Sequence, residues 1–450
     1  MKLLTMLISA STLAMLGGGL VLTASAQGPA SKLVAKTYNS GFEIAHDTYN
    51  AISVASDGRV YYVLSSQSID TGGQMYSFDP KTGKTSHCGD LTEVCGEKGL
   101  KTIVQGKSHV RFVESAGKLY FATHVGYYSM VDGMEKMGIP PAGYKAYPGG
   151  HILSYDLKTG KYDDLAIVPH KEGILTMNMD TKRGLIYCIS WPTGYVFRYD
   201  LSKKEMKEIG LLSGEGENGA GKNFRTLCRS LAIDPVDGAV YATTSEGSIF
   251  RLKPGGDKLE LMEEDLKKDY FGIYDPTSAG HMGYNWRQTV WYAGDNSVYG
   301  VHGNSGYLFQ YDPKADRVSV IDRITSEPSK RSGMFDEFSY GYLGFDLGPD
   351  KHTLYYLTGG PVYVDGQRVK GKSSTAMGEA KGLEDLHLVT YDIVSGKYMD
   401  HGAIFYGDGQ RPLYVNSIAI GQDGTVYTLA RITENGKTRT DLVSVAPVKL

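Results

Sequence analysis

The chain has 450 residues, of which 57 are glycine and 33 are tyrosine. A hydrophobic fraction of 41% with only 22% charged residues is typical of a turn-rich globular protein and excludes a disordered chain. Lysine and arginine number 47 against 50 acidic residues, so the formal net charge of -3 provides no basic excess for binding nucleic acid.

The first 26 residues have the pattern of a secretory signal peptide. Lys2 precedes an apolar run from Leu3 to Leu22, and the small residues of 24–26 form an A-x-A cleavage site. We therefore expect residues 27–450 to be the mature chain, secreted or periplasmic and not attached to a membrane after cleavage. An uncleaved membrane anchor is the alternative, because the apolar run is nearly long enough to span a bilayer.

The four cysteines allow two arrangements. In an oxidising compartment Cys88 could close a short loop with Cys95, and Cys188 could pair with Cys228 on an adjacent strand. The alternative is four buried thiols. No Cys-x-x-Cys motif is present, which excludes the common zinc-ribbon and c-type haem sites.

One sequence pattern recurs seven times along residues 50–450. Each copy has an apolar strand, a turn, a second strand that begins with an apolar residue and tyrosine, a third strand that ends in aromatic-Asp or a variant, and a lysine-rich turn before a fourth strand. The equivalent tyrosines are Tyr61, Tyr120, Tyr187, Tyr241, Tyr299, Tyr355 and Tyr427. Seven four-stranded units predict an all-β, seven-bladed β-propeller with these tyrosines in its core.

The last copy has no fourth strand before the chain ends at Leu450. The segment Leu33–Tyr38, near the start of the mature chain, has a strand-like sequence and no partner in the first copy. We expect it to complete the last blade, since closing the ring removes an exposed sheet edge. Residues 27–450 would then form a single domain.

Aligning the repeats places many polar residues at one rim of the propeller. There the first strand of each blade begins and the second ends, and two long insertions, 126–150 and 359–385, open on the same side. His109, His124 and Trp191 stand where other copies have small residues, which favours a functional role. The rim residues that we expect to bind substrate are Asn50, Tyr128, His151, Trp191, Arg225, Arg287, His302 and His387.

Four stretches of the chain resemble seven-bladed propeller polysaccharide lyases, most closely the ulvan lyase type. They are 106–141, 149–166, 177–200 and 228–252, about a third of the chain. The resemblance implies β-elimination on a uronic acid in an anionic polysaccharide or oligosaccharide. By the same resemblance His109 and His124 match the family's histidines, Arg229 would neutralise the uronate carboxylate, and Tyr195 or Tyr128 would be the rim tyrosine.

A divalent metal remains open in this scheme. The related oligogalacturonate lyases hold a metal with clustered histidines, and His302 and His387 could be ligands here. However, no HxH or HExxH motif brings two imidazoles together in the sequence. The sequence therefore establishes no cofactor, and a divalent metal is the one that it allows.

Two other classes of function fit a propeller. A non-catalytic carbohydrate- or protein-binding propeller is the main alternative, because a fold does not determine a function. A metal-dependent lactonase or glycoside hydrolase is the third. A lactonase needs carboxylates around an axial metal, whereas the aligned inner positions are mostly Asn, His, Thr, Ser and Gln.

Overall fold

The computed structural model describes residues 32–46, 49–131, 134–278, 282–303, 305–332, 344–361, 363–364, 367–368, 384–412 and 415–450. These residues belong to one compact unit, Ser31–Leu450. The predicted signal peptide and most of the second insertion lie outside the described residues.

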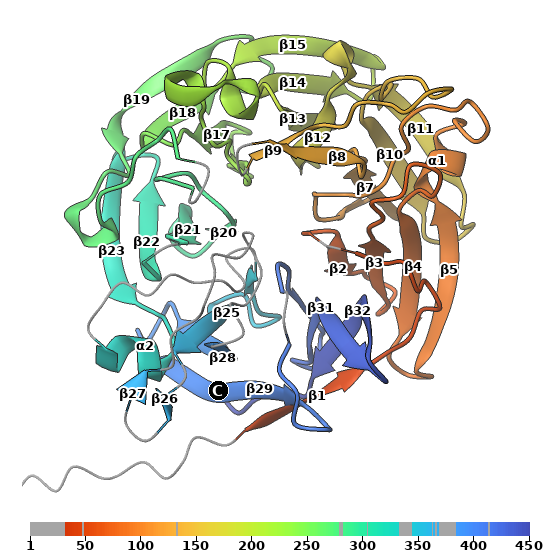
Figure 1. Ribbon diagram of the computed structural model, residues 1–450. Helices are drawn as coiled ribbons and strands as arrows, with labels where there is room; N and C mark the ends of the chain where they lie inside the picture. Colours follow the sequence, from red (N-terminus) through yellow and green to blue (C-terminus); the bar gives the residue numbers. More distant parts are fainter. Residues whose placement is uncertain are drawn as a thin grey trace, which may run out of the picture. The chain divides into compact units, whose positions relative to one another are not determined.

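Five four-stranded antiparallel sheets form most of this unit (Figure 1). The first contains β2 (Ile52–Val54), β3 (Val60–Leu64), β4 (Gln74–Asp79) and β5 (Lys84–Asp90). The second contains β6 (Val113–Ser115), β7 (Lys118–Ala122), β10 (His151–Asp156) and β11 (Tyr162–Ile167). The third contains β12 (Gly173–Asp180), β13 (Leu185–Trp191), β14 (Tyr195–Asp200) and β15 (Glu205–Leu211).

The fourth and fifth sheets repeat the same order. The fourth contains β16 (Ala232–Ile233), β17 (Val240–Thr243), β18 (Ser248–Leu252) and β19 (Leu259–Asp265). The fifth contains β20 (Thr289–Tyr292), β21 (Ser297–Val301), β22 (Tyr307–Asp312) and β23 (Arg317–Arg323). In each of the five sheets, chain order and spatial order agree, as in a meander.

The remaining strands form one eight-stranded sheet. Its spatial order is β24 (Phe345–Leu347), β25 (Thr353–Pro361), β28 (Glu384–Asp392), β29 (Tyr398–Tyr406), β1 (Leu33–Thr37), β32 (Lys437–Val445), β31 (Val426–Glu434) and β30 (Ala419–Ile420). Strand β1 runs parallel to β29 and antiparallel to β32, with Ala35 opposite Val445. The first strand in the sequence is therefore hydrogen-bonded to the last.

Neighbouring sheets meet through their innermost strands. Strand β12 contacts β16, β16 contacts β20, β20 contacts β24, β24 contacts β30, and β30 contacts β2. Figure 1 shows the sheets arranged around a common centre, with β2, β12 and β20 on the inside and β5, β15 and β23 on the outside. This arrangement is the propeller-like, all-β fold that the repeats predict, built mostly from four-stranded antiparallel sheets.

Short elements outside the sheets complete the described part. Two two-stranded hairpins, β8 (Tyr128–Val131) with β9 (Met134–Met137) and β26 (Tyr363–Val364) with β27 (Gln367–Arg368), belong to the two insertions. The helical turns are α1 (Leu91–Val94), η1 (Pro169–Lys171), η2 (Gly216–Asn218), η3 (Gly221–Asn223), η4 (Asp269–Phe271) and α2 (Glu327–Ser332). Within the described residues, no helix is long and apolar enough to cross a membrane.

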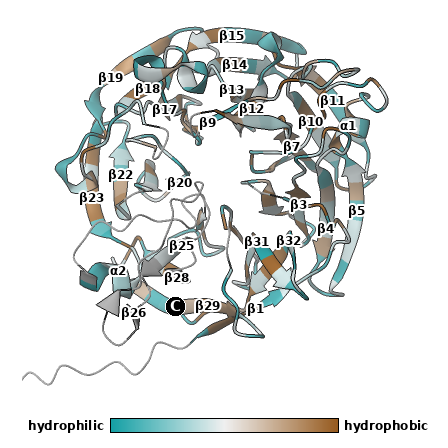
Figure 2. Ribbon diagram, in the orientation of Figure 1, coloured by the Kyte–Doolittle hydropathy of each residue, from teal (hydrophilic) through white to brown (hydrophobic). Residues whose placement is uncertain are grey.

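The repeated tyrosines lie in the core, as the sequence predicts. All seven are at most 9% exposed. Figure 2 shows brown, the colour of hydrophobic residues, on many strands of the sheets. In two repeats the tyrosine hydroxyl donates to the aspartate four residues earlier: Tyr61 to Asp57 at 2.9 Å and Tyr299 to Asp295 at 2.7 Å. A buried hydroxyl without such a partner would cost free energy, so the turn aspartate and the tyrosine stabilise each other.

The four cysteines are all free thiols. Cys95, Cys188 and Cys228 are buried, and Cys88 is half-buried. Burial raises the pKa of Cys188 to about 12, which makes this thiol inert at ordinary pH. The structure thus has the arrangement of four thiols and neither of the two disulfides that the sequence allows.

Candidate functional site

A cavity of about 310 Å³ lies where residues in or just before the innermost strands of five sheets converge. Polar side chains from positions that the repeat alignment makes equivalent line it, among them Asn50, His109, Thr176, Ser230 and Gln288. Arg229, one residue before Ser230, also lines it. Asn50 donates to Gln288 at 2.8 Å, although 238 residues separate them in the chain. The cavity therefore belongs to the centre of the propeller and not to a single sheet.

Four rings follow one another beside this cavity. The centroids of Tyr49 and His109 are 3.8 Å apart and their planes are nearly parallel. His109 lies 4.4 Å from His124, and His124 lies 5.2 Å from Trp191. The two predicted catalytic histidines are thus in contact, and the predicted binding residue Trp191 is adjacent to them.

The imidazole of His124 has a defined tautomer. Its Nδ1 lies 2.9 Å from the carbonyl oxygen of Val125, which can only accept, so Nδ1 carries the proton and Nε2 carries the lone pair. Within the described part of the chain, Nε2 of His124 and Nε2 of His109 are buried without a hydrogen-bond partner. Such atoms are costly unless a ligand meets them, so they point to a binding site.

Both histidines are neutral at neutral pH. Burial, the adjacent His124 and the positive charges of Lys107 and two arginines hold the pKa of His109 well below 6.5. Burial and the charges of Lys107 and Arg229 likewise hold the pKa of His124 well below 6.5. A neutral imidazole among cations can accept a proton once an anion offsets the positive charge.

Lys107 is a member of the site that sequence reasoning missed. It is only 2% exposed, and its Nζ lies 3.3 Å from the hydroxyl of Tyr49. The same Nζ lies 4.5 Å from the ring centroids of Tyr49 and Tyr128, within the range of cation–π attraction. Its backbone pairs with that of His124 through two hydrogen bonds of 3.1 and 2.7 Å.

Tyr49 and Lys107 have a signal in the sequence. Lys107 stands two residues before His109, and alternate residues of an extended segment share a face. Tyr49 directly precedes Asn50, the rim position of the first repeat. The alternation of side chains along an extended segment therefore indicates that Lys107 lies on the same face as His109. The stacking of Tyr49 on His109 joins two different sheets, so the sequence alone does not predict it.

Glu217 holds Arg229 and Trp191 in place. Its carboxylate accepts from Nη2 of Arg229 at 2.7 Å, from Nε1 of Trp191 at 2.8 Å and from the backbone N–H of Leu227 at 3.0 Å. Glu217 is 8% exposed, so these bonds lie in a low-dielectric environment where they are strong. Nζ of Lys136, on the β8–β9 hairpin, donates to the Glu217 carbonyl at 2.7 Å.

The other predicted residues near this rim differ in their partners. Arg287 is buried and its charge helps to lower the pKa of His109, so it belongs to the site. Arg225 forms an ion pair with Glu246 and donates to two backbone carbonyls. The Tyr195 ring stacks on His170 at 4.2 Å, and its ring contacts include neither His109 nor His124.

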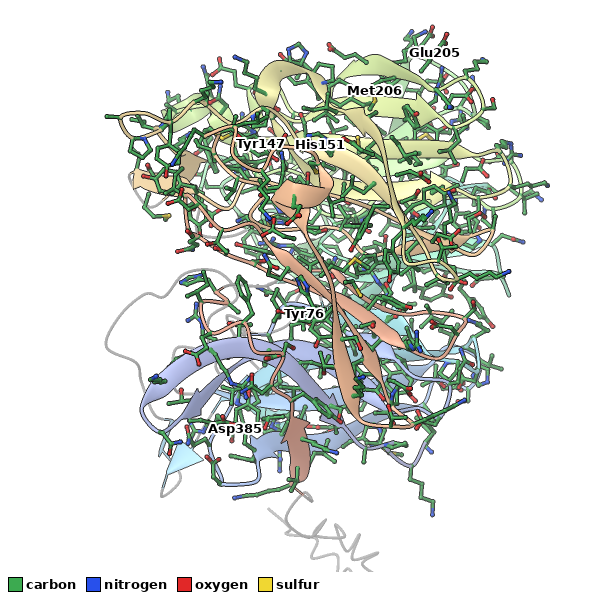
Figure 3. All side chains as sticks on the ribbon, turned by 90° about the vertical axis from the view of Figure 1, so that its right-hand side faces the viewer. Tyr76, Tyr147, His151, Glu205, Met206 and Asp385 are labelled. Atoms are coloured by element: carbon green, nitrogen blue, oxygen red, sulfur yellow. The ribbon has the colours of Figure 1, made fainter. Side chains whose placement is uncertain are left out.

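His151 lies in a separate buried network. Its Nε2 is 2.8 Å from Glu97 and its Nδ1 is 2.9 Å from Asp164. Gln105 donates to Glu97 and accepts from the Tyr147 hydroxyl, and Figure 3 labels Tyr147 and His151 in this region. Burial alone would lower the pKa of His151, but its hydrogen bonds with Asp164, Cys95 and Glu97 raise it to about 11.

His302 and His387 are also held by protein groups. His302 is 3% exposed, stacks on Phe271 at 4.5 Å and bonds Ser305 and the Gly283 carbonyl at 2.8 and 3.0 Å. Nδ1 of His387 lies 2.9 Å from Oδ2 of Asp400. Three of the predicted binding histidines thus already have partners within the protein.

The described residues contain no group of three or more His, Cys, Asp or Glu side chains that could hold a metal ion. His302 and His387, the two ligands that the sequence suggested, lie in different sheets and each has its own protein partners. No step of the chemistry below is therefore assigned to a metal.

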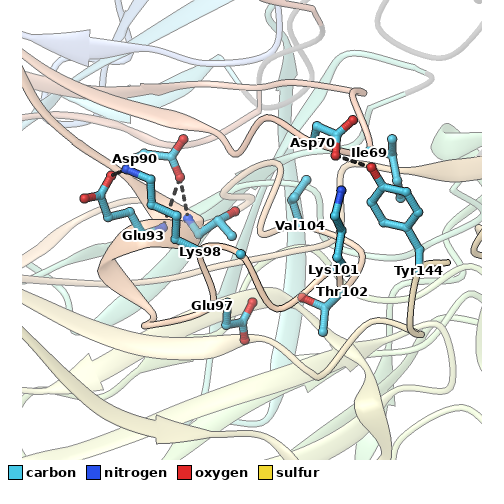
Figure 4. Close-up of a pocket in the computed structure, with 12 residues that line it drawn as sticks. Ile69, Asp70, Asp90, Glu93, Glu97, Lys98, Lys101, Thr102, Val104 and Tyr144 are labelled. Carbon is cyan, nitrogen blue, oxygen red and sulfur yellow. Dashed lines mark hydrogen bonds and ion pairs between the residues drawn. The ribbon is translucent and has the colours of Figure 1, made fainter.

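A second cavity, of about 200 Å³, lies beside α1 (Figure 4). Its charged lining residues have partners within the protein. Lys98 binds Glu93 at 2.7 Å, the hydroxyl of Tyr144 donates to Asp70, and Glu97 binds His151. Because these groups already have partners, this cavity is a weaker candidate than the one at His109.

Comparisons with known proteins show the class of fold. No family model matches the chain, and no curated protein matches it. A chain in the crystal structure of a mitotic checkpoint complex is similar with a TM-score of 0.51 and 10% identity, covering 98% of this chain and 100% of that one. The Cps50 (Swd1) β-propeller domain of Myceliophteria thermophila has a TM-score of 0.50 and 8% identity, covering 92% and 99%.

The C-terminal WD40 domain of Sif2 is a more distant neighbour, with a TM-score of 0.45 and 7% identity. At these identities the similarity shows the fold alone. The chain has a propeller-like, all-β fold. The activity that the sequence resemblance implies stays a prediction.

Proposed function

We propose that this protein is a secreted or periplasmic lyase that cleaves an ulvan-like, uronate-containing polysaccharide by β-elimination. The observation that carries the proposal is the contact between two neutral histidines, the buried His124 and the half-buried His109, next to Lys107 and Arg229. Elimination needs a neutral base and a positive charge that binds the uronate carboxylate, and this combination supplies both.

The chemistry follows from the charges. The proton at C5 of a uronate is weakly acidic, because its removal adds negative charge next to the carboxylate. Arg229, held in place by Glu217, binds the carboxylate without having to reorganise. The same carboxylate offsets the positive charge that keeps the pKa of His109 low, so bound substrate makes His109 a better base.

Within this proposal the propeller has seven blades. The parallel β1–β29 pairing divides the eight-stranded sheet into two groups of four, which add to the five other sheets. Strand β1 then completes the last blade and closes the ring. Export by the segment 1–26 fits an enzyme whose polymeric substrate lies outside the cell.

A propeller that binds without turnover is the second candidate. The similarity to a chain of a checkpoint complex and to the Cps50 propeller favours it, because neither neighbour is described as an enzyme. On this alternative, the cations and unpartnered imidazole atoms hold an anionic carbohydrate or an acidic protein segment. Single substitutions in the site would then weaken binding and affect no reaction.

The two candidates are separated by incubating the mature protein with ulvan, polygalacturonate, alginate or heparan. A lyase produces a conjugated, unsaturated uronate, which is followed by its ultraviolet absorbance. We expect turnover on one polymer and a loss of about 100-fold or more in His109→Gln, the usual size of a general-base contribution. Binding to a polymer without any increase in absorbance would contradict the lyase and support the second candidate.

A further inference from the structure

Tyr49 and Lys107 form a pair at the edge of the histidine cluster. The Tyr49 hydroxyl lies 3.3 Å from Nζ of Lys107, and its ring stacks on His109 at 3.8 Å. The ammonium group has no acceptor site, so the tyrosine oxygen is the acceptor in this contact. The hydroxyl proton of Tyr49 is therefore directed elsewhere.

A proton donor is what the histidines cannot supply. His109 and His124 are neutral, so each can take a proton, but neither carries an extra one to give away. A sugar oxygen that leaves in an elimination must receive a proton, because a free alkoxide is a poor leaving group. The donor must lie next to the base and tolerate a negative charge after the transfer.

Three tyrosines could fill this role, and their surroundings differ. Tyr128 belongs to the β8–β9 hairpin, and its hydroxyl accepts a hydrogen bond from Gln67. The ring of Tyr195 stacks on His170 and not on the histidine pair. Tyr49 alone among the three combines stacking on His109 with a cation at its oxygen.

We propose that Tyr49 donates the proton to the leaving oxygen and that Lys107 positions its hydroxyl and stabilises the phenolate that results. The inference rests on the proposed elimination and deepens it by assigning the acid. Lys107 is a positioning residue in this scheme, since it acts through Tyr49. Its burial strengthens the effect, because an ammonium in a low-dielectric site interacts strongly with an adjacent anion.

The step balances as follows. His109 takes the C5 proton, and the electrons of the C5–H bond form the double bond between C4 and C5. The C4–O bond breaks, and its oxygen takes the hydroxyl proton of Tyr49. The site is left with an imidazolium at His109 and a phenolate at Tyr49, and a net transfer of one proton from the imidazolium to the phenolate through solvent restores both.

The test compares Tyr49→Phe with the rival variants Tyr128→Phe and Tyr195→Phe. We expect kcat to fall by about 100-fold or more in Tyr49→Phe with little change in KM, and by at least about ten-fold less in the other two. Equal or larger losses in Tyr128→Phe or Tyr195→Phe would overturn the assignment. Circular dichroism and a thermal melt show whether each variant is folded.

A substrate with a better leaving group distinguishes proton donation by Tyr49 from a purely structural role. If Tyr49 were only structural, the loss of kcat in Tyr49→Phe would be the same on both substrates. An oligosaccharide analogue with 4-nitrophenoxide at C4 of the uronate needs no acid, because the phenoxide leaves without protonation. We expect the defect of Tyr49→Phe to shrink to less than about ten-fold on this compound, while that of His109→Gln persists. A Tyr49→Phe defect that is the same on both substrates would contradict proton donation.

The pair can also be tested without turnover. Ultraviolet titration of wild-type protein minus Tyr49→Phe isolates the ionisation of Tyr49. We expect its midpoint to rise in Lys107→Met, because the variant removes the positive charge at the oxygen. An unchanged midpoint would overturn the role of Lys107. If the midpoint shifts but wild-type protein cleaves no polymer, the pair exists and the proposed elimination is what fails.

Discussion

Two histidine sites in this propeller have opposite electrostatics. At the central cavity, His109 and His124 lie among cations and have Nε2 atoms without a partner in the described residues. In the second sheet, His151 lies between Glu97 and Asp164, with both ring nitrogens bonded. The first pair has pKa values well below 6.5, and the second histidine has a pKa of about 11.

This difference separates a site from a structural element. The charges around His151 are satisfied within the protein, so the network stabilises the fold and has no vacant bond to offer. The charges that lower the pKa of His109 come from Lys107, Arg229 and Arg287, and Arg229 is paired with Glu217. A bound anion would offset this positive charge. The same residue type at the same rim therefore serves two purposes, and the sign of the neighbouring charge decides which.

Removing His151 should have the largest effect on stability. His151→Leu leaves Glu97 buried without its cationic partner, and breaking such a pair costs about 3–5 kcal/mol. We expect this loss in the free energy of unfolding measured with urea. His109→Gln is the matched control, and its free energy of unfolding should stay within about 1 kcal/mol of wild type or increase. Similar losses in both variants would abolish the distinction.

The pH dependence of stability should differ between the two sites. The pKa of His151 is about 11 in the folded state against 6.5 for a free histidine, so its contribution is complete below pH 6.5 and is lost as the pH rises through about 11. Glu97, Asp164 and Cys95 face His151 and take part in this loss. His109 and His124 affect stability at acid pH, because their pKa values are well below 6.5 in the folded protein. As the pH falls below 6.5 the unfolded state binds protons at these residues first, so the free energy of unfolding decreases.

Unfolding curves between pH 5 and pH 10 check this prediction. The difference between wild type and His151→Leu should narrow toward high pH, and the difference between wild type and His109→Gln should change only below about pH 6.5. A His151→Leu difference that is constant across the whole range would show that the carboxylates do not hold an imidazolium.

The smallest expected effect is a change in the pKa of His109 when a sugar binds in the central cavity. Binding of glucuronate, a single uronate unit, should raise the pKa of His109, because the carboxylate offsets the charges of Lys107, Arg229 and Arg287. Nuclear magnetic resonance of the imidazole protons measures this pKa with and without the sugar. His151 provides the internal comparison and should titrate unchanged. A lowered or constant His109 pKa at saturating glucuronate would contradict anion binding at this cavity.

The fold could be predicted from the sequence because the repeats carry it. An apolar second strand with its buried tyrosine recurs in every copy, and an aspartate stands four residues before the tyrosine in four of the seven copies. Such local patterns are read directly from the chain. The structure of insertions and contacts between residues far apart in the chain cannot be read in this way. The carboxylate partners of the rim histidines are contacts of this long-range kind.

The candidate site was predictable in part for the same reason. His109 and His124 depart from small residues at equivalent positions, and the structure brings their rings together. His151 and His387 stand out in the sequence in a similar way, yet Asp164 and Asp400 on the adjacent outer strands bind them. Strand register decides these pairings, and the alignment of repeats does not contain the β-bulges that set it.

Strand β1 also has a consequence for biosynthesis. It is among the first parts of the propeller to be synthesised, yet its antiparallel partner β32 ends five residues before the last residue of the chain. The β1–β32 ladder can therefore form only after strands β2 to β31 have been synthesised, and until then β1 lacks its antiparallel partner. A chain shortened by the last fifteen residues would lose all of β32, and with it the antiparallel partner of β1.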